Sequence, residues 1–269
     1  MDIIEIEKSL ITRYRTKLYN KFVKGLLEYE MLAENDVVGV CISGGKDSLV
    51  LAKMFQEFVK HGSIKIEAKY LVMNPGFNQE NLDRLILNAK KMGIPIIIRD
   101  SNVFQVAENH GGENPCYLCA RMRRGFLYKF ASDLGCNKIA LGHHFNDVIE
   151  TTLLNVFYGG TFKTMLPKLK AENFDNMELI RPMYYVEERH IINYMKYCEI
   201  EAMNCGCKIA SGELSSKRKE MKELIAKMKL SFKDVEKSIF QSGNNVNLDR
   251  VLGWTKENKK SSFLDDYIK

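Results

Sequence analysis

The segment 43–48, SGGKDS, has the residue types of an anion-binding loop. It stands between the apolar, valine-rich run 37–42 and a predicted helix that begins at Lys46. Two adjacent glycines let successive backbone N–H groups turn toward one point at the positive end of the helix dipole. The motif lacks the longer GxxxxGK[ST] spacing of loops that serve γ-phosphate transfer. We therefore predict a phosphate site here, the alternative being a glycine turn without a ligand.

A second polar segment also lies between a predicted strand and a predicted helix: Gly142-His143-His144, followed by Asp147. Taken alone, its histidines are typical of polar loop residues, and Asp147 is typical of a cap on the first helical turn. In parallel sheets, however, ligands bind beyond the carboxyl ends of the strands. This segment, the glycine loop and the loop at Pro75 all follow predicted strands, so we expect them at one edge of the sheet.

A pair of thiols, Cys116 and Cys119, follows Pro115 at the start of a predicted helix. The helix dipole favours thiolates at this position, and the arginines in 121–124 add positive charge nearby. Both effects lower a thiol pKa, as a metal ligand or a nucleophile requires. The spacing therefore indicates a metal-binding or catalytic pair.

Two further thiols, Cys205 and Cys207, lie far downstream in a predicted loop. Three grouped thiols suit an iron–sulfur cluster with one iron left open, whereas four would close a structural zinc site. The spacing alone does not decide between the iron–sulfur cluster and the zinc site. The other three cysteines, Cys41, Cys136 and Cys198, are predicted to pack among apolar residues.

The motif SGGxDS resembles that of the PP-loop family of ATP pyrophosphatases, whose members cleave ATP between the α and β phosphates. The GHHxxD segment resembles the second nucleotide segment of this family, although Asn146 stands where the family often has another acid before Asp147. The resemblance implies that the loop holds pyrophosphate and that Asp47 lies near Mg²⁺. The predicted ATP-binding residues are Ser43, Gly44, Gly45, Lys46, Asp47, Ser48, Met73, Gly142 and His143.

Residues 115–125, PCYLCARMRRG, closely resemble a segment of the tRNA 2-thiocytidine synthetases, and KIALGHH, FYGG and IRP extend the match. The resemblance covers residues 13–224. It implies a [4Fe-4S] cluster on three cysteines, for which we expect Cys116, Cys119 and Cys205. Because CGC at 205–207 departs from the usual CxxCG, Cys207 is the alternative third ligand. The predicted catalytic residues are Asp47, Asp147, Cys116 and Cys119.

The activity that the resemblance implies is ATP-dependent tRNA thiolation. The C2 oxygen of a tRNA base, a cytidine of the anticodon loop, would be adenylated and then replaced by sulfur from a cysteine desulfurase or free sulfide. A homodimer is compatible with the family. Basic residues of the amino-terminal helix and of 121–124 and 217–219 would track the RNA backbone, the alternative being solvated helix faces.

Several other functions fit part of the pattern. A tRNA 2-thiouridine synthetase would act at another position, and a thiolase that uses a protein persulfide would need one reactive thiol and no cluster. A lysidine synthetase or an amidotransferase would not need the CxxC pair. Outside the enzymes, a zinc-stabilised nucleotide- and RNA-binding protein would bind ATP without forming AMP.

The elements that must position these residues alternate between strand and helix from residue 36 onward, which predicts an α/β fold with a parallel, doubly wound sheet. We predict an amphipathic basic helix in 1–35, a PP-loop ATP-binding domain in 36–200, and a cysteine loop with a helical carboxyl-terminal extension in 201–269.

Composition agrees with one large domain and a small appendage, since the chain has 269 residues, of which 45% are hydrophobic and 28% charged. The formal charge of +6 permits nucleic acid as a partner without requiring it.

Seven cysteines, an odd number, are typical of a reducing compartment. No apolar run approaches the roughly 18 residues of a membrane span, and the amino terminus lacks a signal-peptide pattern, so we expect a cytoplasmic protein without a membrane partner.

Overall fold

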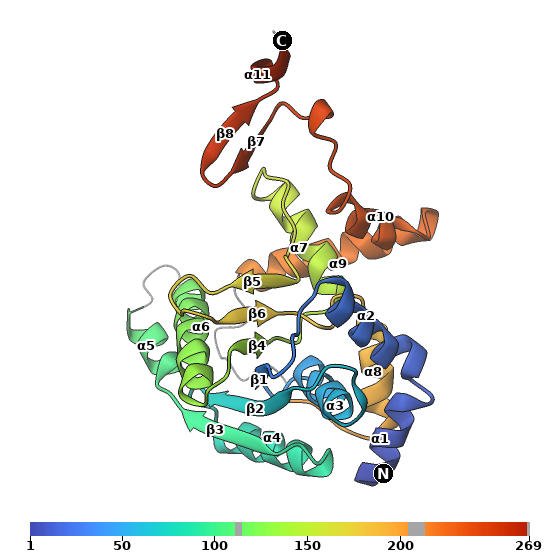
Figure 1. Ribbon diagram of the computed structural model, residues 1–269, viewed down its shortest axis with the longest axis vertical. Coiled ribbons are helices and arrows are strands. Elements are labelled where there is room, and N and C mark those ends of the chain that lie inside the picture. The colour runs from blue at the N-terminus through green and yellow to red at the C-terminus, as the bar shows by residue number, and fades with distance from the viewer. Residues whose placement is uncertain (111–114, 204–212, 268–269) are drawn as a thin grey trace.

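The computed structural model describes residues 1–110, 115–203 and 213–267, and its centre is one six-stranded sheet (Figure 1). The strand order is β3-β2-β1-β4-β6-β5. All neighbouring pairs are parallel except β5 with β6, which is antiparallel. The strands are β1 (Val37–Ile42), β2 (Glu67–Asn74), β3 (Ile96–Asp100), β4 (Lys138–Ala140), β5 (Lys168–Lys170) and β6 (Glu178–Ile180). The predicted parallel sheet is confirmed, and the antiparallel edge strand β5 is an addition to it.

Helices cover both faces of this sheet, as predicted for a doubly wound fold. Successive side chains of a strand point to opposite faces. Val40 of β1 accordingly packs with α3 (Lys46–His61) in one apolar core. Its neighbour Cys41 packs with Phe130 of α6 (Pro115–Asp133) in another. The remaining helices are α1 (Ile3–Ile11), α2 (Asn20–Glu28), α4 (Gln79–Lys91), α5 (Val103–His110), α7 (Phe145–Phe157), α8 (Glu188–Tyr197), α9 (Glu213–Ser231), α10 (Val235–Ser242) and α11 (Leu264–Tyr267).

The amino-terminal segment is not the single helix that its periodicity predicts. A π-helical turn at Arg15–Tyr19 separates α1 from α2. The apolar residues of this segment recur every four positions, and at 3.6 residues per turn such a stripe drifts by about 40° with each step. The wider π turn offsets this drift. Leu10, Leu18 and Phe22 are all fully buried in the core beside α3.

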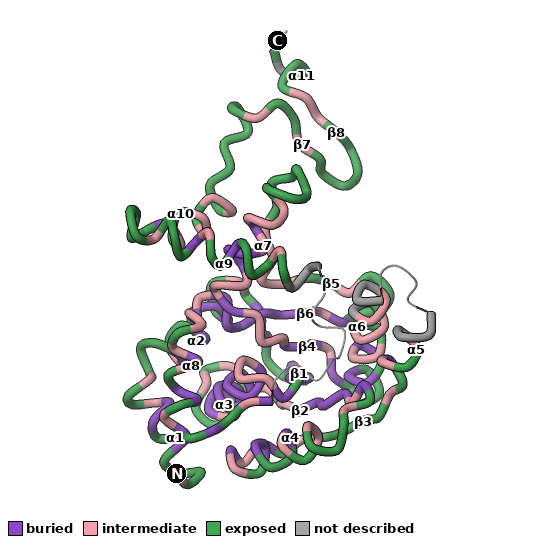
Figure 2. Tube along the Cα trace, turned by 180° about the vertical axis from the view of Figure 1, so that it is seen from behind, coloured by how far each residue is buried: buried purple, intermediate pink, exposed green. Residues whose placement is uncertain are grey.

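The carboxyl-terminal segment is not helical throughout. After α9 and α10, the chain forms a hairpin of β7 (Gly253–Lys256) and β8 (Lys259–Ser262), which the polar and weakly periodic sequence did not predict. Figure 2 shows this hairpin as an exposed projection, while the buried residues gather in the sheet and in α3. Among the described residues, no helix has the length and apolar character to cross a membrane.

A buried ion pair fastens α1 to α3. The Lys53 side chain is fully buried, and its Nζ donates to Glu7 Oε1 at 2.9 Å and to the Met92 carbonyl at 3.0 Å. We expect Glu7→Gln to lower the free energy of unfolding by about 3 kcal/mol, because it leaves a buried ammonium without its counter-charge. Lys60→Met, which removes an exposed partner of the same Glu7, is expected to cost under about 1 kcal/mol. Urea unfolding midpoints of the two variants, compared with the wild type, measure both effects. Equal midpoints for Glu7→Gln and Lys60→Met would contradict the prediction.

Candidate active site

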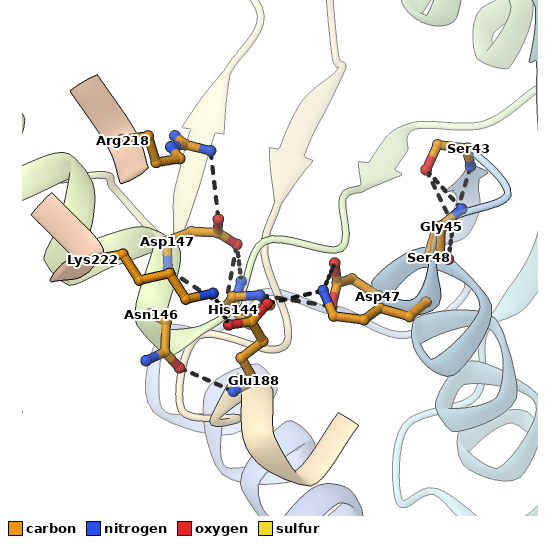
Figure 3. A network of polar contacts seen from close by, with 11 residues as sticks. Ser43, Gly45, Asp47, Ser48, His144, Asn146, Asp147, Glu188, Arg218 and Lys222 are labelled. Carbon is orange, nitrogen blue, oxygen red and sulfur yellow. Dashed lines mark hydrogen bonds and ion pairs between the residues drawn. The ribbon is translucent and has the colours of Figure 1, made fainter. Parts of the chain in front are cut away.

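The loop after β1 is shaped by its own serines and by one left-handed glycine. Gly44 has a φ of +82°, a backbone conformation that disfavours residues with a Cβ atom. The Ser48 hydroxyl donates to the Gly45 carbonyl at 2.8 Å and accepts from the Ser43 N–H at 3.2 Å (Figure 3). Gly45 is the N-cap of α3 and has no side chain to cap it. The first N–H groups of α3 therefore stand available to an anion.

The GHH segment lies directly against this loop. A Cβ atom built on Gly142 would stand 3.2 Å from the backbone nitrogen of Ser48 and 3.2 Å from the carbonyl carbon of Asp47. A side chain at this position would press on the backbone of Asp47 and Ser48, so glycine suits this close approach. The two segments that were predicted to meet at one sheet edge are therefore in contact.

A cavity of about 420 Å³ opens between these segments and α6. Its lining contains most of the predicted ATP-binding residues, namely Ser43, Asp47, Ser48, Met73, Gly142 and His143, together with Asp147. Gly44, Gly45 and Lys46 belong to the adjoining loop and do not line it. Arg123 and Arg124 of α6 also line the cavity, so part of the 121–124 patch that was predicted to track RNA borders this cavity.

Asp47 carries one carboxylate oxygen with a partner and one without. Oδ2 accepts from Lys46 Nζ at 3.0 Å. Oδ1 is buried, has no hydrogen-bond partner among the described residues, and lies 3.6 Å from His144 Nε2. Asp47 lines the cavity, and a carboxylate oxygen is the kind of ligand that Mg²⁺ takes in addition to phosphate oxygens. The residues present therefore fit the magnesium ion that the motif implies.

Lys46 is also bound to a residue from a distant part of the chain. Its Nζ lies 3.1 Å from Glu188 of α8, and Glu188 accepts from Lys222 of α9 at 2.6 Å. Burial would raise the pKa of Glu188, but hydrogen bonds from Lys222 and Lys46 hold it at about 2. This carboxylate is thus ionised at neutral pH and links the loop to α9 (Figure 3).

Asp147 has the helix-capping role that its position alone suggested. Its carboxylate accepts from the His144 N–H at 2.9 Å, while the His144 ring accepts from the Asp147 N–H at 3.4 Å. The other carboxylate oxygen lies 3.6 Å from Arg218. Asn146, where the family often has an acid, accepts from the Glu188 N–H at 2.9 Å and donates to Glu236. A carboxylate could accept but not donate, so the amide suits this bridge between α8 and α10.

His143 is held neutral beside a guanidinium. Arg181 Nε donates to His143 Nδ1 at 3.2 Å, which assigns the ring hydrogen of the neutral form to Nε2. Burial and the neighbouring Arg181 lower the pKa of His143 to about 4. At neutral pH, the cavity is therefore lined by an uncharged imidazole that can donate a hydrogen bond.

Glu150, one turn after Asp147, is buried at the same site. Burial and the nearby Asp147 charge raise its pKa from 4.5 to about 7. Because the folded state prefers the protonated acid, the stability that it contributes is present below pH 4.5 and is lost as pH rises through 7. We expect Glu150→Gln to remove this loss, which amounts to as much as about 3 kcal/mol. The free energy of unfolding of the wild type and of Glu150→Gln, measured in urea without nucleotide from acidic to alkaline pH, checks this prediction. If the two free energies change with pH in parallel, the prediction is wrong.

The thiols fall into two groups. Cys41, Cys136 and Cys198 are buried, as predicted, and burial raises their pKa values, to about 12 for Cys41 and about 11 for Cys136. Cys116 and Cys119 lie in the first turns of α6, where Cys119 is half-buried. Cys119 stands one turn before Arg123, so the helix that carries the pair also borders the cavity.

The third predicted cluster ligand, Cys205, and its alternative Cys207 lie outside the described residues. In the part of the chain that the structure describes, no three His, Cys, Asp or Glu side chains form a metal-binding group. The chemistry of the donor set still fits a cluster, because the CxxC pair sits at a helix amino terminus beside arginines.

Sequence reasoning did not select several residues of this site: Glu150, Arg181, Glu188, Arg218 and Lys222. Arg181 lies within the IRP match, which could have singled it out. Arg218 was assigned only to a basic patch, but it pairs with Asp147 at the site. For Glu188 and Lys222, the sequence offers no signal, because their roles depend on how α8 and α9 pack.

The chain is similar to known proteins over most of its length. Residues 12–204 match the family model of the PP-loop domain. The tRNA-cytidine(32) 2-sulfurtransferase of Geobacter metallireducens is 32% identical, over 89% of this chain and 95% of that protein. The protein of the same name from Photobacterium profundum is 34% identical, over 87% of this chain and 77% of that protein.

The fold is similar to a solved thiolase structure, the U34-tRNA thiolase NcsA from Methanococcus maripaludis with its [4Fe-4S] cluster. The TM-score is 0.68 at 21% identity, over 88% of this chain and 80% of that chain. This likeness supports the fold, and the sequence relatives support the family predicted from the motifs. The chain belongs to the tRNA-cytidine(32) 2-sulfurtransferase family of PP-loop proteins.

Proposed function

We propose that this protein is an ATP-dependent tRNA thiolase, which adenylates the C2 oxygen of a cytidine in the tRNA anticodon loop and replaces that oxygen by sulfur. One observation carries the proposal: a single cavity is bordered by the phosphate loop, the GHH segment and the helix with the CxxC pair. The names of the sequence relatives favour cytidine over the uridine alternative.

Adenylation converts the C2 oxygen of the base into part of a better leaving group. Oxide is a poor leaving group, so the base oxygen must become part of a phosphate ester before sulfur can displace it. The N–H groups at the start of α3 and the Lys46 ammonium would stabilise the departing pyrophosphate. Asp47 would supply a ligand to Mg²⁺ through its unpartnered oxygen. No side-chain nucleophile is required for this step.

Sulfur delivery would depend on the cysteines. We assign Cys116, Cys119 and Cys205 as ligands of a [4Fe-4S] cluster, with Cys207 as the alternative to Cys205. Held by these three thiolates, such a cluster would supply the chemistry that delivers sulfur to the activated base. The cationic Arg123 and Arg124, which follow the pair on α6, would attract the phosphates of the adenylated base toward it.

The remaining partners follow from this chemistry. The substrate is tRNA, the sulfur source is free sulfide or a cysteine desulfurase, and tRNA modification of this kind takes place in the cytoplasm. A homodimer is the assembly that we propose.

The direct test is turnover with defined reactants. Anaerobically purified protein is incubated with ATP, Mg²⁺, an unmodified tRNA transcript and sulfide. We expect one AMP for each thiolated tRNA, with 2-thiocytidine detected by mass spectrometry of the digested RNA. ATP binding without AMP would instead support a nucleotide- and RNA-binding protein without turnover, and 2-thiouridine would support the uridine alternative.

A further inference from the structure

A second cavity, of about 570 Å³, lies where α2, α8, α9 and α10 meet. We call it the basic groove. Six cationic side chains from all four helices and the turn between α9 and α10 line it, against three carboxylates. The cations are Lys21, Lys24, Arg189, Lys229, Lys233 and Lys237. Because they come from three distant parts of the sequence, their grouping is a product of the fold.

Acidic neighbours neutralise only some of these charges. Arg189 pairs with Glu187 at 2.7 Å, Lys237 pairs with Asp234 at 2.7 Å, and Lys229 pairs with Glu236. Lys24 pairs with Glu28 at 3.5 Å at the rim. Lys21 and Lys233 form no ion pair with any carboxylate in the described part of the chain. The groove is therefore left with an excess of positive charge.

Packed aromatic rings make the floor of the groove rigid. Phe240 of α10 lies 5.0 Å from Phe145 and 5.5 Å from Tyr185, measured between ring centroids. The Lys24 ammonium stands 4.4 Å above the Tyr185 ring, and the Tyr185 hydroxyl donates to Glu28 at 2.5 Å. These contacts hold the cationic side chains around a preformed concave surface.

Two pairs of adjacent residues connect the basic groove with the polar network beside the phosphate loop. Phe145 lines the groove, and its neighbour Asn146 accepts from the Glu188 N–H at 2.9 Å. Glu187 lines the groove, and its neighbour Glu188 binds Lys46 of the phosphate loop. Asn146 and Glu188 stand together beside the site in Figure 3. The basic groove thus adjoins the polar network that holds Lys46, and the two cavities share no lining residue among those that the structure describes.

Helix α9 carries cationic residues both at the active site and in the basic groove. Arg218, Lys222 and Lys229 are spaced by four and seven residues, which puts them on one face of the helix. Arg218 and Lys222 contact Asp147 and Glu188 at the active site, whereas Lys229 lines the groove. The same face of α9 therefore carries paired cations both beside the active-site segments and in the groove.

We propose that the basic groove binds the sugar–phosphate backbone of the substrate tRNA next to the modified nucleotide. The inference rests on the proposed function, because it assumes an RNA whose target base reaches the nucleotide cavity. Lysines on such a surface would contact the phosphates that flank an unstacked nucleotide of a single-stranded RNA loop, as backbone-positioning contacts do in RNA recognition.

The test replaces the two unpaired lysines, neither of which touches the nucleotide cavity. We expect Lys21→Glu/Lys233→Glu to raise the Kd for tRNA at least about tenfold, and to lower the slope of log K against log salt by about 2. The KM for tRNA should rise while kcat and the Kd for ATP stay unchanged. The matched control, Lys65→Glu/Lys90→Glu, changes the same number of exposed charges away from the groove and should leave the tRNA Kd within about twofold.

The other possible results distinguish a failure of the groove assignment from a failure of the proposed function. Equal tRNA affinity for the groove variant and the control, with thiolation intact, would overturn the groove assignment and leave the proposed function standing. A wild-type protein that neither binds nor thiolates tRNA would overturn both. A groove variant that binds tRNA normally, but loses thiolation only when a desulfurase supplies the sulfur, would make the groove a docking site for that protein instead.

Discussion

Cys116→Ala and Cys119→Ala are each expected to reduce tRNA thiolation by more than about 100-fold, because a cluster that loses one of three thiolate ligands is not retained in working form. ATP and tRNA should bind as before, since the loop after β1 and the basic groove contain neither residue. Thiolated nucleoside from digested tRNA, measured beside iron, zinc and acid-labile sulfide content, checks the prediction.

A suitable control is Cys198→Ala. Cys198 is a buried thiol at the carboxyl-terminal cap of α8, and burial raises its pKa, so its loss should cost stability without changing iron content. Wild-type protein with about four irons and four sulfides supports the cluster assignment. One zinc and no iron would make Cys116 and Cys119 structural ligands, and undiminished thiolation by Cys116→Ala would remove them from the reaction.

Asp47→Asn is the second change for which we expect a large effect, a decrease in AMP formation of about 10²- to 10³-fold. The substitution keeps the shape of the side chain and one of its hydrogen-bond acceptors, so the loop and its serine hydrogen bonds should persist. It removes the negative charge from the buried Oδ1 that is left without a partner. AMP release, followed as a function of Mg²⁺ concentration, should show both a lower maximum and a requirement for more metal.

The matched control is Asp83→Asn on the exposed surface of α4, which should behave as wild type. Thermal melting of both variants in the absence of nucleotide separates a metal effect from a folding effect. If Asp47→Asn keeps the wild-type rate and Mg²⁺ dependence, the assignment of Asp47 to the metal is wrong.

Part of this site could be predicted because its chemistry is local. The glycine pair and serines of 43–48 shape a loop through contacts within six residues, and strand-to-helix alternation fixes the sheet edge to which the loop belongs. The same holds for Gly142, whose missing side chain permits contact with Asp47 and Ser48. Backbone preference and hydrophobic periodicity act over short distances, so they are readable in a single sequence.

Other parts depend on contacts that periodicity does not encode. The π turn at Arg15–Tyr19 and the antiparallel β5 result from fitting side chains against elements distant in the sequence. A basic residue in 217–222 has the same sequence pattern whether it is solvated, bound to RNA or paired with an acid.

The amino-acid sequence by itself therefore predicted the parallel sheet and the meeting of the loop 43–48 with the GHH segment at its edge. Only the tertiary structure decided that Glu188 links Lys46 to Lys222, that Arg218 reaches Asp147, and that lysines of α2 and α10 share one groove. The physical reason is range: loop and helix propensities are properties of neighbouring residues, whereas the pairing of charges depends on distances that exist only after the core has packed.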